Sequence, residues 1–360
     1  MKYIGTPNYQ HNINPKIGVL LTNLGTPQAP TAKALKPFLK QFLWDPRVVE
    51  APRPIWWLIL NGIILNTRPK RSAVAYSSVW TERGSPLLGH LEDQVAGINE
   101  RLNSQFGDKF IVRGAMRYGI PAISDVLEEM FDAGMQKLMV FPLYPQYAGP
   151  TTGSTFDAVT AELIHRRWLP SFRFLNAYHD DPRYIEAISS SIKAHWSNHG
   201  RADRLLLSYH GMPKRYLMEG DPYHCQCHRT SRLVAESLSL SEGEYITTFQ
   251  SRVGRQEWLQ PYTDDTLKLL PKEGVESVQI ICPGFSADCL ETIEEIGIEN
   301  HEYFVKNGGT RYEYIRCLNS LPKHLDALTE LLIEQLGEWV NAETDPKFTD
   351  QLARAMGARQ

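Results

Sequence analysis

The distribution of apolar positions along the chain predicts strands that alternate with helices. Short apolar runs closed by turn residues are typical of buried strands in a parallel sheet, and residues 205–209 form the clearest run. This run leads directly to His210 and stops at Gly211, Met212 and Pro213. Similar patterns predict further strands at 16–24, 110–117, 136–144, 244–249 and 277–282.

Helices are expected where apolar residues recur every three or four positions. Thr31 can cap a helix that runs to Phe42. Residues 88–106 carry four apolar residues at helical spacing, Leu91, Val95, Ile98 and Leu102. Further helices are predicted at 121–133, 261–270 and 321–340, a loop at 68–72, and a polar, disordered tail at 341–360.

The order of these elements occurs twice. Arg117-Tyr-Gly119 and Arg252-Val-Gly254 follow corresponding strands, as do Phe141-Pro142 and Cys282-Pro283. Two halves that each contain a βαβ unit predict an α/β protein of two similar doubly wound domains, whose strands end at a shared cleft. We assign the domains to 16–172 and 173–320, and expect the helix at 321–340 to pack back on the first.

Composition narrows the function classes. A net charge of −3, with 22% charged residues, gives no overall basic field that would recruit nucleic acid. Residues 1–16 are polar and lack the apolar core of a secretory signal, so we expect a cytoplasmic protein. Five cysteines, an odd number, do not suit a disulfide framework and are expected to be reduced thiols.

One segment, 55–65, is strongly apolar but too short to span a bilayer. The cations Arg68, Lys70 and Arg71 follow it. This combination suits a helix that lies in the membrane interface, with peripheral membrane contact through 55–71. A core helix followed by a surface loop explains the pattern equally well, and both alternatives stay open.

Two motifs of the second half carry candidate chemistry. His210 follows a buried strand, where the active sites of parallel sheets lie, although a lone histidine there is often structural. A helix capped by Ser286 would place Asp288, Glu291 and Glu295 on one face. Such a stripe can be merely solvated, but carboxylates near a histidine also suit a divalent cation such as Fe²⁺ or a proton relay.

The loop 144–155 could hold a phosphate or carboxylate at a helix start, and its tyrosines could pack on a flat ligand. Arg117, Tyr118 and Trp258 are expected near the same cleft, a lining that favours a flat, apolar, anionic ligand. The chain has no Walker A sequence, no Gly-x-Gly-x-x-Gly after the first strand and no Gly-x-Ser-x-Gly, so we expect no nucleotide partner.

The motif His224-Cys-Gln-Cys-His228 contains good zinc or copper ligands. Its Cys-x-Cys spacing is closer than that of the usual zinc knuckle, and no second cysteine pair follows. A structural metal here is therefore the weaker interpretation.

Seven islands, in order, make the chain similar to the ferrochelatases over about 17–336. This family inserts Fe²⁺ into protoporphyrin IX to give protohaem, with release of two protons, in the last step of haem synthesis. The islands are Leu21-Thr-Asn-Leu-Gly-Thr-Pro27, Gly84-Ser-Pro-Leu87, Met116-Arg-Tyr-Gly119, Tyr144-Pro-Gln-Tyr147 with Thr151-Thr-Gly-Ser154, Ser208-Tyr-His-Gly-Met-Pro213, Gln250-Ser-Arg-Val-Gly254 with Trp258, and Asp288-Cys-Leu-Glu-Thr292.

The resemblance implies a fold of two four-stranded parallel-sheet domains facing a cleft, and it implies roles for single residues. His210 and Glu291 match the inner catalytic and metal-binding pair, and Asp288 and Glu295 the outer metal path. The segment near Trp56 matches a lip that approaches the inner face of the membrane. The positions that match the porphyrin pocket are Leu24, Arg117, Tyr118, Tyr147, Ser154 and Trp258.

Two departures from the family affect what is expected. Some members hold an iron–sulfur cluster on C-terminal cysteines, but the last cysteine here is Cys317, so we expect no cluster and no cofactor beyond the substrate Fe²⁺. Cys289 stands where some members have histidine. Whether His210 is a base or a direct iron ligand stays open. So do two other functions, chelation into coproporphyrin or another tetrapyrrole, and non-catalytic tetrapyrrole or metal binding.

Overall fold

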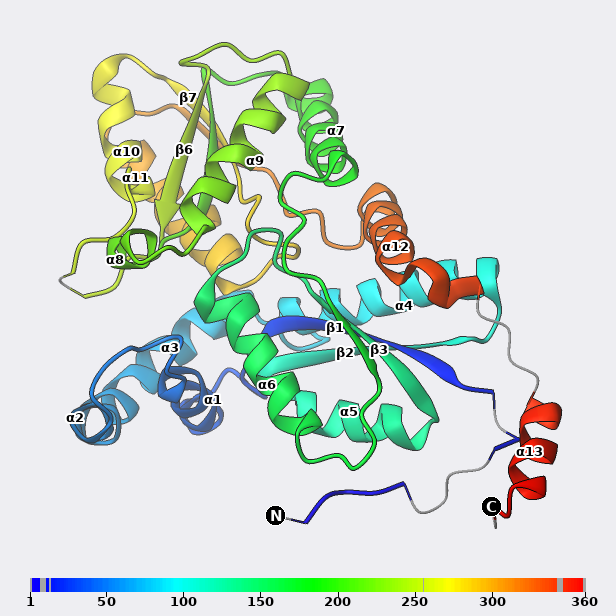
Figure 1. Cartoon of the computed structure of the whole chain (residues 1–360). Coiled ribbons are helices and arrows are strands. Elements are labelled where there is room, and N and C mark those ends of the chain that lie inside the picture. Colours follow the sequence, from blue (N-terminus) through cyan, green and yellow to red (C-terminus); the bar gives the residue numbers. More distant parts are fainter. Residues whose placement is uncertain (1, 7–10, 13, 255, 342–345, 359–360) are drawn as a thin grey trace.

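The strands of the chain form two separate four-stranded sheets, and all neighbouring strands in both are parallel (Figure 1). The computed structural model describes residues 2–6, 11–12, 14–254, 256–341 and 346–358. The first sheet has the order β2-β1-β3-β4 and the second β6-β5-β7-β8, so the two halves share one topology. This confirms the predicted pair of similar α/β units. The strands are β1 (Lys16–Thr26), β2 (Phe110–Gly119), β3 (Met135–Pro142), β4 (Ser171–Phe174), β5 (Arg204–His210), β6 (Tyr245–Gln250), β7 (Ser277–Ile281) and β8 (Arg311–Tyr314).

Helices cover both faces of each sheet (Figure 1). The predicted cap is present, because the Thr31 hydroxyl accepts a hydrogen bond from the Ala34 N–H at 3.3 Å. The α-helices are α1 (Ala32–Trp44), α2 (Arg53–Ile59), α3 (Leu65–Val79), α4 (Pro86–Phe106), α5 (Ile123–Asp132), α6 (Ser154–Leu163), α7 (Pro182–His199), α8 (Lys214–Met218), α9 (Tyr223–Ser237), α10 (Thr263–Leu269), α11 (Asn300–Lys306), α12 (Pro322–Leu336) and α13 (Pro346–Ala355). Three segments are π-helical, η1 (Leu60–Ile64), η2 (Gly149–Gly153) and η4 (Glu291–Glu299), and two are 3₁₀-helical, η3 (Leu270–Glu273) and η5 (Gly337–Asn341).

The inner faces of the two sheets share one hydrophobic core. Side chains alternate across a strand, so Leu205 and Leu207 point into the shared core while Leu206 packs in a separate outer cluster with α10 and α11. Helix α12 contacts both α4 and α7, and Arg101 on α4 pairs with Asp326 on α12 at 2.7 Å. The halves are thus joined by apolar packing, which orients the strand ends of one toward the other.

Three predictions of local structure are wrong. Residues 68–72 lie inside helix α3, not in a loop. Residues 346–355 of the tail form α13, while 342–345 and 359–360 lie outside the described residues. The acidic helix does not begin at Ser286, because its π-helical part starts only at Glu291. The edge strands β4 and β8 were implied by the family resemblance alone, since four residues are too few for a visible pattern.

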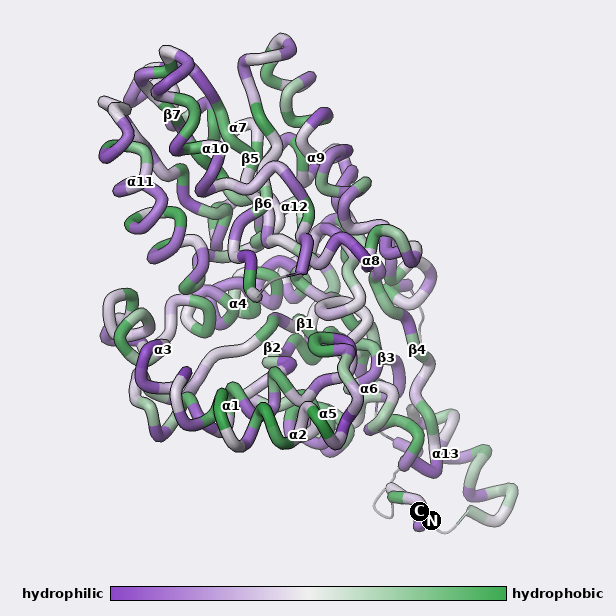
Figure 2. Tube along the Cα trace, turned by 90° about the vertical axis from the view of Figure 1, so that its left-hand side faces the viewer, coloured by the Kyte–Doolittle hydropathy of each residue, from purple (hydrophilic) through white to green (hydrophobic). Residues whose placement is uncertain are grey.

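The first part of the apolar segment 55–65 lies on the outside of the molecule. Helix α2 buries none of its residues, whereas Leu60 and Leu65 are buried against α1, so the core-helix alternative is wrong for α2 and correct for the end of the segment. Trp56 anchors the segment by donating its indole N–H to the Leu43 carbonyl at 2.7 Å. Figure 2 shows green, hydrophobic stretches in the chain near α1 and α2 at the edge of the molecule. The more exposed apolar side chains are Ile55, Trp57, Leu58 and Ile63.

Candidate active site

His210 stands at the carboxyl end of β5 with one ring nitrogen fixed. Its Nδ1 lies 2.7 Å from the Gly211 carbonyl oxygen. Because a carbonyl only accepts hydrogen bonds, Nδ1 carries the proton of the neutral ring and Nε2 keeps a free lone pair. The histidine is half-buried. This tautomer can accept a proton or donate an electron pair to a metal through Nε2.

Close packing beside His210 requires the glycine that follows it. A Cβ on Gly211 would lie 2.7 Å from the Gln250 carbonyl oxygen and 3.2 Å from the Trp258 ring. The Trp258 indole N–H donates to the Val253 carbonyl at 2.9 Å, which fixes the ring in this place. The structure therefore brings Trp258 next to the strand end that carries His210.

One side chain connects His210 to the acidic π-helix η4. Gln250 pairs in register with His210 across β5 and β6. Its amide donates to the Glu291 carbonyl oxygen at 3.1 Å. The two predicted inner residues, His210 and Glu291, are thus brought to the same edge of the second sheet.

Glu295 lies one turn further along η4, and its carboxylate accepts hydrogen bonds from the loop that follows β6. The Ser251 N–H donates to one carboxylate oxygen at 2.7 Å, and the Ser251 hydroxyl donates to the other. Burial, opposed by the two Ser251 hydrogen bonds and reinforced by the negative charge of Glu291, raises the pKa of Glu295 to about 7. A carboxyl group with this pKa can both hold and release a proton near neutral pH.

Asp288 is separated from the other two carboxylates. It precedes η4, it is 1% exposed, and it is enclosed by donors. The Tyr314 hydroxyl donates at 2.5 Å and the Asn319 amide at 2.9 Å, and the Thr292 hydroxyl is 3.1 Å away. The predicted single face of Asp288, Glu291 and Glu295 is therefore not formed. The assignment of Asp288 to a metal path stays a prediction.

The first half contributes α3 to this region, and sequence reasoning did not identify its part. Helix α3 contacts η4, and the charge of Glu291 acts on both Arg68 and Tyr76. Burial, followed by the charge of Glu291, raises the pKa of Tyr76 well above its ordinary value. Arg68 and Tyr76 are eight residues apart and share a helix face, a signal that the prediction of a loop concealed.

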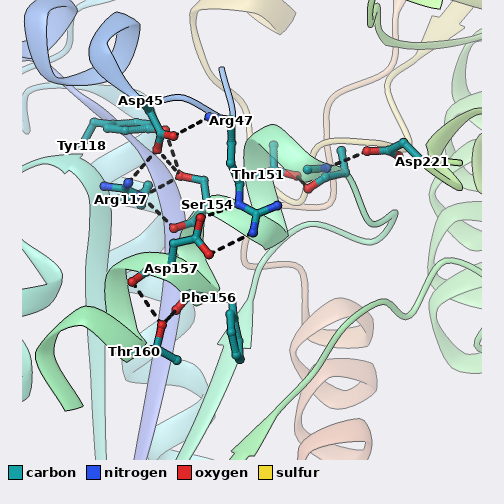
Figure 3. Close-up of polar contacts among 12 residues, drawn as sticks. Asp45, Arg47, Arg117, Tyr118, Thr151, Ser154, Phe156, Asp157, Thr160 and Asp221 are labelled. Atoms are coloured by element: carbon teal, nitrogen blue, oxygen red, sulfur yellow. Dashed lines mark hydrogen bonds and ion pairs between the residues drawn. The ribbon is translucent and has the colours of Figure 1, made fainter. Parts of the chain in front are cut away.

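A second group of predicted residues forms a buried network in the first half (Figure 3). Asp45 accepts hydrogen bonds from Arg117 and the Ser154 hydroxyl, both at 2.6 Å, and from the Tyr118 hydroxyl at 2.8 Å. Burial alone would raise the pKa of Asp45, but the hydrogen bonds from Ser154, the Arg47 N–H and Tyr118, with the charge of Arg117, bring it below its ordinary value.

This network fixes three of the residues that match the porphyrin pocket, Arg117, Tyr118 and Ser154. Tyr118 and Ser154 are fully buried, whereas Arg117 lines a surface pocket of about 440 Å³ together with Asp45 and Gln41. Leu24 and Tyr147 are half-buried. The structure thus places Trp258 and Glu291 near His210, and Arg117, Tyr118 and Ser154 around Asp45. The individual roles of the predicted residues stay predictions.

The small-residue loop does not offer open donors to a phosphate. The Gly149 N–H donates to the Asp221 carboxylate at 2.7 Å, and the Ser154 hydroxyl donates to Asp45 (Figure 3). The chain's own carboxylates therefore occupy the positions that an anion would take. This removes the main support for a phosphate-handling enzyme.

The five cysteines are free, as predicted, within the part of the chain that the structure describes. Cys227 is buried and Cys225 is exposed, so the motif at 224–228 does not gather four ligands. Across the described ranges, no three side chains of His, Cys, Asp or Glu are arranged to hold a metal ion. None of the helices in the described ranges combines the length and the apolar character that a membrane span requires.

Comparisons with known proteins give a consistent result. A family model described as Ferrochelatase matches residues 16–336. The chain is 62% identical to "Ferrochelatase" of Teredinibacter turnerae, covering 96% of this chain and 94% of that protein. It is 58% identical to "Ferrochelatase" of Marinobacter nauticus, covering 98% and 95%.

A solved structure supports the fold alone. SirB from Bacillus subtilis, with Fe³⁺, is 11% identical, with a TM-score of 0.54 over 91% of this chain and 98% of that one. At this identity the likeness concerns the arrangement of strands and helices.

Proposed function

The chain belongs to the ferrochelatase family, and from this premise we propose how its residues perform the family reaction. The protein is a metal chelatase, a lyase that inserts Fe²⁺ into a porphyrin for haem synthesis. We propose protoporphyrin IX as the porphyrin. One Fe²⁺ replaces the two N–H protons of the free base, so the reaction releases two protons and needs no oxidant or reductant.

The reaction has a steric and an acid–base requirement. The free porphyrin is planar, and its central lone pairs become accessible only when the ring is bent. A pocket complementary to the bent ring spends binding energy on that distortion. Trp258, packed beside His210, and Tyr76, half-buried near Glu291, supply rigid apolar surfaces at this place.

His210 is the proton acceptor of this proposal. Its Nδ1–H is fixed on the Gly211 carbonyl, so the free Nε2 is the atom that takes a pyrrole proton. The Gly211 carbonyl also stabilises the imidazolium that forms, because it accepts from Nδ1 throughout. This single contact is the observation that carries the mechanism.

Glu291 and Glu295 complete the proton and metal path. Glu291 lies at the same sheet edge, where its carboxylate can position Fe²⁺, a cation that accepts carboxylate and imidazole ligands. Glu295, with a pKa of about 7, passes protons outward. Asp288 acts through its hydrogen-bonded cage, which fixes the start of η4.

Helix α3 offers a cation to the charged groups of the substrate, and helix α2 offers an apolar surface to the membrane. Arg68 forms no ion pair with a described side chain, and it lies close enough to Glu291 for the two charges to interact. Its guanidinium is therefore suited to pair with a propionate group of the porphyrin. The exposed apolar side chains of α2, followed by cations of α3, suit peripheral contact with the inner face of the membrane in the cytoplasm. The protein requires no iron–sulfur cluster in this proposal.

The test is anaerobic turnover with protoporphyrin IX and Fe²⁺, followed by collapse of the four-band free-base spectrum into the two-band metalloporphyrin spectrum. His210→Ala should lower kcat by at least about 100-fold, the scale of general-base catalysis, and leave porphyrin binding nearly intact. His199→Gln, a distant surface histidine on α7, is the matched control. Retained turnover in His210→Ala contradicts the mechanism. Conversion of coproporphyrin but not of protoporphyrin IX would show that coproporphyrin is the substrate.

A further inference from the structure

Two histidines on helix α9 lie side by side away from the porphyrin chemistry. His224 and His228 are four residues apart, and their ring centroids are separated by 4.4 Å with 52° between the ring planes. Residues at this spacing occupy the same face of an α-helix, one turn apart. Two imidazoles in this arrangement can direct nitrogens at one point.

The packing of α9 explains this position. Tyr223 and Cys227, also four residues apart, are buried between the helix and the sheet. The histidines form the adjoining stripe, beside the edge strand β6. The His224 ring stacks on buried Phe249 at 5.7 Å and 18° between planes. This stacking holds the ring in one orientation, so less side-chain freedom is lost when a ligand binds.

The pair lies on the sheet face opposite to the active site. Neighbouring residues of a strand point to opposite faces. Phe249 contacts His224, whereas the next residue, Gln250, donates to Glu291. A ligand on the histidine pair is therefore separated from Glu291 by the sheet.

Both imidazoles are available as ligands. Among the described residues, neither ring has a hydrogen-bond partner. Burial lowers the pKa of both histidines, and His224 lowers that of His228 further, which favours the neutral ring with its free lone pair. The chain offers a contrast, since His195 and His199 have the same 4.4 Å separation, but His195 Nε2 is engaged by Glu313 at 2.8 Å.

We propose that His224 and His228 together bind one borderline divalent cation, such as Zn²⁺ or Co²⁺, with water completing the coordination. Imidazole is a preferred ligand of these metals. No third protein ligand is arranged to join them in the part of the chain that is described. The helix dipole at the start of α9 weakens the site about two- to fivefold. A site with two protein ligands exchanges its metal readily and is distinct from a structural zinc site.

The test uses a parent variant, His210→Ala with Glu291→Gln, which removes the active-site ligands. Titration calorimetry with Zn²⁺ should show one equivalent bound by the parent. Adding His224→Gln or His228→Gln should weaken this binding at least tenfold. Cys225→Ser and His199→Gln are the matched controls and should bind as the parent does. Visible absorption of the Co²⁺ form should show nitrogen and oxygen ligands without a sulfur-to-cobalt band.

Two results would overturn the proposal. Unchanged Zn²⁺ binding in both histidine variants shows that the metal lies elsewhere. Loss of binding in Cys225→Ser, with a sulfur-to-cobalt band in the parent, shows a different ligand set. His228 is the more exposed of the two histidines, so His228→Gln keeps the test valid if His224→Gln disturbs the packing on Phe249.

Discussion

The side-chain amide of Gln250 donates a hydrogen bond of 3.1 Å to the main-chain carbonyl of Glu291. The same side chain accepts from the Ser208 hydroxyl at 2.9 Å. Gln250 thereby joins the strand pair that carries His210 to the helix that carries Glu291. It touches no reacting atom and acts as a positioning residue.

Gln250→Leu should lower kcat by about tenfold, equivalent to ~1.4 kcal/mol, because Glu291 loses the contact that positions it. Porphyrin binding should change little. The variant also removes the Gln250 acceptor of the buried Ser208 hydroxyl and leaves Thr263 Oγ1, 2.9 Å away, as its remaining acceptor, so the lost hydrogen bond costs about 1 kcal/mol of stability. Steady-state kinetics and urea unfolding measure the two effects.

The control is Gln279→Leu, since Gln279 is another buried amide of the second sheet, bonded to the Gly200 carbonyl and Glu313. It should lose comparable stability and keep kcat. Equal loss of kcat in both variants would mean that Gln250 acts only through stability.

Glu295 predicts a pH-dependent stability. Its pKa is raised from an ordinary 4.5 to about 7, so the folded protein binds more protons than the unfolded chain between these values. The free energy of unfolding therefore falls as pH rises from 4.5 to 7, by at most about 3 kcal/mol. Glu295→Gln removes this loss. Its stability relative to the unmodified protein should increase up to about pH 7 and stay constant above.

Chemical unfolding at pH 5, 6, 7 and 8 checks this prediction. Glu302→Gln is the control, because the pKa of Glu302 is lowered by Lys306, and its effect should not increase with pH. A Glu295→Gln difference that is flat over the series would show that the Glu295 carboxyl titrates at its ordinary pKa.

Asp288 predicts a structural defect when its charge is removed. Asp288→Ala removes the acceptor of the half-buried Tyr314 hydroxyl and Asn319 amide, which should cost about 2–4 kcal/mol. Thermal unfolding measures the loss, and Glu299→Ala on the exposed side of η4 should cost much less. If Asp288 serves a metal path instead, stability would be kept and the KM for Fe²⁺ would rise.

The sequence correctly predicted that His210 lies at the end of a buried strand. An apolar run followed by Gly211 and Pro213 leaves only one position for the strand end. It could not predict the cage of Asp288. The partners Tyr314 and Asn319 are 26 and 31 residues further along the chain, at and beyond the end of β8. A local sequence pattern cannot predict contacts between residues so far apart in the chain. The acidic stripe was assigned α-helical spacing, whereas η4 is π-helical and begins only after Asp288.

Helix α3 was missed for a different reason. Pro69 flanked by cations is typical of a loop, because proline lacks the N–H that an α-helix uses. Here the π-helical turn η1 runs directly into α3, so Pro69 lies in the first turns of α3. The wider π-helical turn just before it accommodates the backbone hydrogen bond that proline cannot make. The shared face of Arg68 and Tyr76 becomes visible only once this helix is recognised.

The exposed face of α2 predicts reversible membrane binding. Trp57 and Leu58 are 54% and 63% exposed and have no core contact to lose. Trp57→Ser with Leu58→Ser should therefore keep stability and turnover in detergent, yet lower partition onto anionic phospholipid vesicles by at least about tenfold, since burying each side chain contributes roughly 1.5–3 kcal/mol. Vesicle sedimentation measures the partition. Leu269→Ser, an equally exposed apolar residue on α10, is the control, and equal sedimentation of all three proteins would remove α2 from the membrane contact.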